Sequence, residues 1–165
     1  MYTPLSLSPD GVNRIARYCG EEVRRQYANV WEPDLALRVS GMIEAWMDAI
    51  KRQFYGELIT PYAIKSWGAS IEPRNAKGFR RVPIFVGLQQ KLPWQLVDKS
   101  IEDFTQAVFE ERFDPFESYR EFEEIHPFED GNGRTGKIIL NWVNGTLLDP
   151  IFPPDDFWGP RIINP

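Results

Sequence analysis

The chain has 165 residues, of which 42% are hydrophobic, so it is long enough to fold as one domain with a substantial core. Its net charge of −5 argues against a general role in binding nucleic acid or anionic membranes, and no apolar run approaches the ~18 residues that a membrane helix needs. Cys19 is the only cysteine and the start lacks a charged, apolar leader, so the sequence predicts a cytoplasmic, reducing location.

The first 59 residues are predicted to form N-terminal helices. Ser8 suits a helix N-cap and Pro9 suits the first helical position, and apolar residues then recur at helical spacing as far as Val23. Pro33 is predicted to open a second helix, which Gly56 closes. The apolar stripe of this second helix consists of Leu35, Val39, Met42, Ile43, Trp46, Ile50 and Phe54.

The central segment is predicted to hold a short helix and then a β element. Thr60 and Pro61 indicate a helix start, and the helix is predicted to end near Gly68. Residues 72–78 have the composition of a loop, and residues 78–87 (GFRRVPIFVG) have the character of a strand. A proline within this strand cannot donate to a ladder, so we expect an edge strand or a hairpin.

The remaining sequence predicts three more helices and an extended tail. Pro93 and Trp94 precede the first of these helices, Pro115 opens the second, and apolar residues after 137 indicate the third. Prolines are frequent beyond residue 149, which favours an extended strap over residues 155–165. The sequence therefore predicts one mainly α domain over residues 1–165, with a small β element.

The segment between the last two helices, HPFEDGNGRTGK at residues 126–137, carries the candidate chemistry. His126 is the only histidine and a possible proton acceptor, and Asp130 is a possible metal ligand. Glycines at 131 and 133 allow a concave set of backbone N–H groups at a helix start, where anions bind. Arg134 and Lys137 are three residues apart, so both can reach one anion.

Three familiar patterns also fit residues 131–137. They are the G-x-G-x-x-G of dinucleotide-binding folds, the G-x-x-x-x-G-K of P-loops and the Asn-Gly of hairpin turns. The first two require a buried strand in front, whereas the preceding FESYREFEEI is charged and helical in period. The P-loop also lacks its hydroxyl residue, because Ile138 stands there. A helix, an anion-binding loop and a second helix remain as the favoured interpretation.

The run His-Pro-Phe-x-Asp-Gly-Asn-Gly-Arg resembles the signature of Fic-domain proteins. The resemblance extends over roughly residues 60–154, because residues 78–87 resemble the β-hairpin flap that Fic proteins place before the motif. It implies a Fic-type helical bundle with the flap beside the active-site loop.

The resemblance implies transfer of AMP from ATP to a Ser, Thr or Tyr hydroxyl of a target protein. His126 would accept the hydroxyl proton, and Asp130 would hold Mg²⁺ between the phosphates. The remaining positions of the motif would bind phosphate oxygens or the departing pyrophosphate: Gly131, Asn132, Gly133, Arg134 and Lys137. Glycines at 131 and 133 favour AMP transfer over the phosphate transfer of the similar Doc-type toxins.

The flap implies a protein partner, because an edge strand can pair with an extended segment of a target. Phe79, Val82 and Ile84 are the residues expected to clamp the target or the nucleotide. A plain edge hairpin without this role is the alternative.

Two features of the sequence depart from the family pattern. Lys137 stands where a second arginine is usual, so γ-phosphate binding is expected to weaken or another nucleotide-linked donor to be used. Ser40–Ala45 is similar to an inhibitory helix pattern, with Glu44 as the inhibitory residue and Ala45 as a departure. A separate, antitoxin-like inhibitory partner is the alternative. A Fic-like module that binds a nucleotide or partner without chemistry, or a P-loop-like nucleotidase, remains open.

Overall fold

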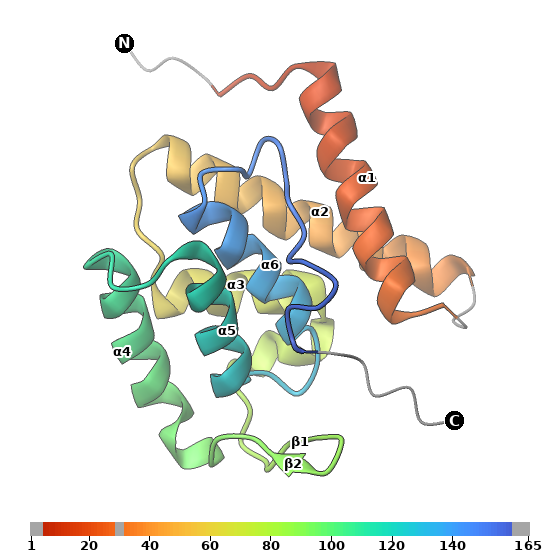
Figure 1. Ribbon diagram of the computed structural model, residues 1–165. Helices are drawn as coiled ribbons and strands as arrows, with labels where there is room; N and C mark the ends of the chain where they lie inside the picture. The colour runs from red at the N-terminus through yellow and green to blue at the C-terminus, as the bar shows by residue number, and fades with distance from the viewer. Residues whose placement is uncertain (1–4, 29–31, 160–165) are drawn as a thin grey trace.

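The computed structural model describes residues 5–28 and 32–159 and consists mainly of α-helices, with one small hairpin at the edge (Figure 1). The helices are α1 (Pro9–Gln26), α2 (Glu32–Phe54), α3 (Pro61–Ile71), α4 (Val97–Phe109), α5 (Pro115–Ile125) and α6 (Asn132–Val143). Short 3₁₀ turns, η1 (Pro73–Lys77) and η2 (Trp94–Leu96), flank the hairpin of β1 (Phe85–Val86) and β2 (Gln89–Gln90). The predicted fold class is therefore confirmed.

Local capping explains where the helices begin. The Ser8 hydroxyl accepts a hydrogen bond from the Gly11 amide at 3.1 Å, and Thr60 caps α3 in the same way. Asp114 and Glu117 form a reciprocal capping box at the start of α5. The predicted starts at Pro9, Pro61 and Pro115 are therefore confirmed, since each proline follows a capping side chain.

The predicted end of α3 at Gly68 is wrong, because the helix continues to Ile71. A β-carbon at Gly68 would lie 2.2 Å from the Phe128 ring, so the glycine makes room for a side chain of the loop between α5 and α6. Phe128 is fully buried there and packs against Phe79 with ring centroids 5.5 Å apart. Gly68 thus serves tertiary packing instead of ending the helix.

The β element lies later in the chain than predicted. Its two strands pair antiparallel with Phe85 opposite Gln90 and Val86 opposite Gln89, while residues 79–84 are irregular. The strand was predicted from alternating apolar residues. However, Arg80 is buried and its side chain is hydrogen-bonded to other segments, so residues 79–84 do not pair as a β-strand. The hairpin protrudes at the lower edge of the molecule in Figure 1.

The core is formed where α6 packs against α2, α3 and α5, in the centre of Figure 1. Large buried side chains such as Trp46 and Trp67 fill it. α1 packs along α2, and its Tyr18 hydroxyl donates to the Ile151 carbonyl, so the segment after α6 is tied to α1. Within the predicted extended tail, residues 155–158 form a turn, and residues 160–165 lie outside the described part.

None of the helices in residues 5–28 and 32–159 has the length and apolar character needed to span a bilayer.

Candidate active site

The loop between α5 and α6 begins and ends with left-handed residues. His126 is the C-cap of α5 with φ 50° and ψ 62°, and Gly131 is the N-cap of α6 with φ 80°. The amide of Thr135 donates to the Gly131 carbonyl at 3.0 Å, which leaves the amides of residues 132–134 without an acceptor inside the helix. The anion-binding turn therefore stands at a helix N-terminus, as the sequence predicts.

The Asn132 side chain has a different role from the one predicted. It is buried, accepts from the Phe128 amide at 2.9 Å and donates to the Phe128 carbonyl at 2.9 Å. Both ends of its amide are therefore occupied in closing the loop. Asn132 is left with its backbone N–H as the group that can meet a phosphate.

Arg80 ties the loop to the segments on both sides of the hairpin. Its buried guanidinium donates to the carbonyls of His126 at 2.7 Å and Ile125 at 3.3 Å. It also donates to Val82 and Leu92, which precede and follow the hairpin, at 3.0 and 2.6 Å. One side chain thus fixes the backbone of the His126 loop relative to the hairpin.

The His126 ring is kept neutral. Burial, with 15% of the side chain exposed, lowers the pKa of His126 to about 4, and the positive charges of Lys91 and Arg80 act in the same direction. Nδ1 lies 3.3 Å from the Glu123 carbonyl, a contact that is satisfied when Nδ1 carries the proton. The unprotonated Nε2 is then the basic atom, as a general base requires.

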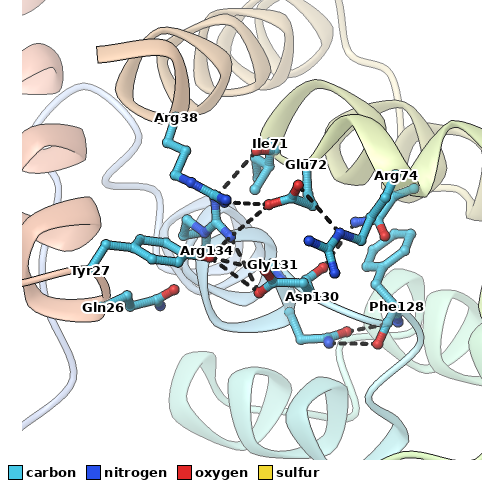
Figure 2. A network of polar contacts seen from close by, with 12 residues as sticks. Gln26, Tyr27, Arg38, Ile71, Glu72, Arg74, Phe128, Asp130, Gly131 and Arg134 are labelled. Carbon is cyan, nitrogen blue, oxygen red and sulfur yellow. Dashed lines mark hydrogen bonds and ion pairs between the residues drawn. The ribbon is translucent and has the colours of Figure 1, made fainter. Parts of the chain in front are cut away.

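Arg134 lies at the centre of a network of polar contacts (Figure 2). The fully buried guanidinium donates to the Tyr27 hydroxyl at 2.7 Å and lies 3.4 Å from Asp130 and 3.6 Å from Glu72. Glu72 also pairs with Arg38 of α2 and, at 3.5 Å, with Arg74. The charge predicted to meet pyrophosphate is therefore balanced by internal carboxylates.

The Asp130 carboxylate is suited to hold a magnesium ion only when a bound triphosphate supplies further oxygen ligands. Its carboxylate is 34% exposed and accepts from the Tyr27 hydroxyl at 3.1 Å and from the Gly131 amide at 2.7 Å. Within the described residues, no group of three or more His, Cys, Asp or Glu side chains converges as a metal site. Mg²⁺ commonly needs one carboxylate, phosphate oxygens and water, so the residues present fit an ion that arrives with a triphosphate.

Lys137 is paired with a carboxylate from α1. Its ammonium lies 2.9 Å from Glu22 and 3.3 Å from the Tyr119 hydroxyl, and both Lys137 and Glu22 are buried. Glu44, the predicted inhibitory residue, is exposed on α2 away from these groups. The inhibitory role of Glu44 stays a prediction, and the acid that contacts Lys137 is Glu22 of α1.

The C-terminal end of α1 covers the anion-binding turn. The Gln26 amide nitrogen lies 3.1 Å from the position that a Gly133 β-carbon would take, and Tyr27 contacts Arg134 and Asp130. A nearby cavity of about 290 Å³ is lined by Arg38, Ile71 and Glu72, among others. The end of α1 therefore lies directly against the turn.

The three predicted flap residues differ in accessibility. Phe79 is buried against Phe128 and is part of the core, so the structure contradicts its role as a target clamp. Val82 is 43% exposed and Ile84 is half-buried, which leaves both available for contact. The most exposed apolar residue of the hairpin is Leu88, in its turn.

Sequence reasoning missed several residues of the site: Glu22, Tyr27, Glu72, Arg80 and Glu123. Glu123 stands three residues before the histidine, and this helical spacing was a usable signal. The other four reach the loop from segments at least 40 residues away in the chain, and no local pattern marks them.

Comparison with known proteins identifies the family of this segment. Residues 94–143 match the model of the Fic/DOC family. This stretch is narrower than residues 60–154, over which the sequence resembles Fic-domain proteins. The chain is also similar to a Fic family protein from Desulfovibrio desulfuricans G20, with 19% sequence identity and a TM-score of 0.43. That match covers 90% of this chain and 62% of the other, so this chain spans less than two thirds of that protein's length. The stretch of this chain that matches the Fic/DOC family model includes α4, α5, the motif and α6.

Proposed function

We propose that the protein transfers AMP from ATP to a Ser, Thr or Tyr hydroxyl of a target protein. The observation that carries this proposal is a neutral His126 at the entrance of a helix-start anion turn. A base that is unprotonated at neutral pH and a set of backbone donors are the two elements that phosphoryl chemistry requires. The family match supports a transferase in general, and AMP as the group transferred is our inference.

The proposed reaction is an in-line substitution at the α-phosphorus. The target oxygen forms a bond to the α-phosphorus while its proton moves to His126 Nε2. The bond between the α-phosphorus and the bridging oxygen breaks, and its electron pair leaves with pyrophosphate. The amides of residues 132–134 and the charges of Arg134 and Lys137 bind the phosphate oxygens as negative charge shifts toward the leaving group.

Magnesium is the metal that these residues fit. Asp130 would hold it, and bound Mg²⁺ would neutralise phosphate charge. The Asp130 carboxylate must first exchange its contacts with Tyr27, whose hydroxyl now donates to it.

The covered turn supports a closed resting state that opens for ATP. Glu22 neutralises Lys137, and Gln26 and Tyr27 lie over the turn. We propose that displacement of the end of α1 frees Lys137 for the γ-phosphate. In this proposal Glu22 of α1 acts as the inhibitory acid, and Glu44 has no part in it.

A target segment is proposed to dock at the hairpin. Val82, Phe85 and Val86 are exposed there, and the edge of a two-stranded sheet offers unpaired backbone groups. Arg80 holds this region to the His126 loop, so a docked hydroxyl would have a fixed position relative to the base.

Labelling with ATP that carries ³²P at the α or the γ position tests the proposal. With Mg²⁺ and a cell lysate, we expect labelled protein from the α position and none from the γ position. His126→Ala should abolish the label, whereas Glu129→Gln, which alters an exposed acid of the same loop, should retain it. Label from the γ position would instead show phosphate transfer, and equal labelling by His126→Ala would remove His126 from the mechanism.

A second candidate function is nucleotide binding without transfer, which Lys137 in place of arginine and the covered turn favour. Calorimetry that detects ATP binding, together with no labelled product for wild type or for Glu22→Gln, would support this candidate.

A further inference from the structure

Glu123 is a largely buried acid, and the reaction proposed above gives it no role. It lies one turn before His126 on α5, and 14% of its side chain is exposed. Its Oε1 atom is enclosed and has no hydrogen-bond partner among the described residues. A buried carboxyl oxygen without a partner is costly and uncommon, so its presence calls for a physical reason.

Two lysines lie around Glu123, but the ammonium group of each is paired with a different carboxylate. Lys137 approaches from α6, but its ammonium pairs with Glu22 of α1 at 2.9 Å. Lys91 faces it from the segment after β2 and pairs with Glu124 at 3.5 Å. Burial chiefly, together with Glu22 and Glu124, raises the pKa of Glu123 to about 7, although Lys137 and Lys91 act in the opposite direction.

The carboxyl group of Glu123 stands beside the nitrogen of His126 that does not face the substrate. Its Oε2 lies 3.8 Å from Nδ1, while its backbone carbonyl lies 3.3 Å from the same atom. When Nε2 accepts a proton, the buried ring becomes positive next to Lys91 and Arg80, which disfavour that charge. Among the acids of the described residues, Glu123 is the one whose carboxylate lies within ion-pair distance of the ring.

We infer that Glu123 is a positioning residue for His126. Its ionised carboxylate holds the ring with the proton on Nδ1 and offsets the positive charge that the ring gains when Nε2 takes the hydroxyl proton. This inference rests on the proposed role of His126 as the base. It adds that the active form of the site has Glu123 ionised, so AMP transfer should increase as the pH rises through the pKa of Glu123.

Nuclear magnetic resonance of the imidazole ring tests the inference without any assay of activity. His126 is the only histidine, so ¹⁵N labelling of histidine gives one set of ring signals. In the wild-type protein we expect Nδ1 to stay protonated from pH 5.5 to 8.5, with a shift of the ring signals whose midpoint lies near 7. In Glu123→Gln this shift should disappear, and in Glu121→Gln, which alters an exposed acid of the same helix, it should persist.

Kinetics give the second arm of the experiment. Glu123→Gln should lower kcat for AMP transfer roughly 10- to 100-fold and leave the KM for ATP nearly unchanged, because the acid acts through His126. The residual activity should no longer rise with pH near 7. Glu123→Asp should recover part of kcat by restoring the charge.

The two arms separate this inference from the proposed function. An undetectable AMP product in the wild-type protein would overturn the transferase proposal, and the ring signals would still decide whether Glu123 governs His126. A wild-type ring without a transition near pH 7, or a transition that survives in Glu123→Gln, would overturn the inference even if AMP transfer is found.

Discussion

The two ends of the loop between α5 and α6 differ in how their side chains are held and how their charges are balanced. At the histidine end, Arg80 fixes the backbone through the carbonyls of Ile125 and His126, and the ring is neutral. At the anion end, Arg134 and Lys137 are neutralised by Glu72, Asp130 and Glu22, and α1 covers the turn.

This difference shows how one loop can combine a rigid base with a closed anion site. A base needs a fixed position and a suitable pKa before the substrate arrives. Buried cations, in contrast, are stable only when they are paired, so the protein supplies carboxylates where phosphate is expected to bind. In the proposed reaction, the nucleotide would therefore replace internal acids at one end only.

Removing Arg80 should have the largest effect on the histidine end of the loop. We expect Arg80→Met to lower the free energy of unfolding by about 4 kcal/mol or more, because it leaves four carbonyls without their donor. Urea unfolding measures this loss. Arg81→Met should cost less than about 1 kcal/mol, since Arg81 is exposed and pairs with Asp98 at the surface. Equal losses in both variants would contradict the role of Arg80.

The pH dependence of the free energy of unfolding tests the shifted pKa values at the histidine end. The pKa of His126 is lowered to about 4, so the unfolded chain binds more protons below pH 6.5 and stability rises with pH across this window. The pKa of Glu123 is raised to about 7, so the folded state binds more protons above pH 4.5 and stability falls with pH. The two effects should nearly cancel in the wild-type protein.

Removing either residue should reveal the other. From pH 4.5 to 6.5 we expect the free energy of unfolding to rise by about 2 to 3 kcal/mol in Glu123→Gln and to fall by a similar amount in His126→Asn. Urea unfolding at several pH values measures both slopes. The same slope in all three proteins would mean that neither group has a shifted pKa.

Removing the carboxylate that pairs with Lys137 at the anion end should have a smaller effect, which is on nucleotide affinity. We expect Glu22→Gln to raise the affinity for ATP with Mg²⁺ about tenfold, because Lys137 loses its competing carboxylate. Calorimetric titration measures the affinity. Glu21→Gln, which changes an exposed acid of the same helix, should bind ATP like the wild type. An unchanged affinity in Glu22→Gln would mean that α1 does not compete with the nucleotide.

The smallest expected effect is at Tyr27. Tyr27→Phe removes one hydroxyl that donates to Asp130, so half-saturation of ATP binding by Mg²⁺ should require about two- to threefold less metal. Titration of ATP binding with Mg²⁺ measures this change. Tyr62→Phe, on an exposed part of α3, is the control and should show no shift. A higher Mg²⁺ requirement in Tyr27→Phe would show that the hydroxyl helps Asp130 instead of competing for it.

Much of the fold near the motif follows from local sequence signals. Capping residues before Pro9, Pro61 and Pro115 place three helix starts correctly, because a cap and its helix are neighbours in the chain. The strand over residues 78–87 was misplaced because apolar alternation takes no account of a buried arginine. Phe79 and Asn132 were given ligand roles for a similar reason, since their actual contacts are with Phe128.

Local sequence patterns are enough to predict the helix–loop–helix around His126 and the turn at residues 131–134, because glycine conformations and helix periodicity are properties of short segments. The acids that meet Lys137 and Arg134, the contacts of Arg80 with the loop, and the Glu123 Oε1 atom without a partner beside His126 are visible only in the folded protein. The physical reason is that pairing and burial of charge depend on packing between α1, α3, α5 and α6, which no short stretch of sequence encodes.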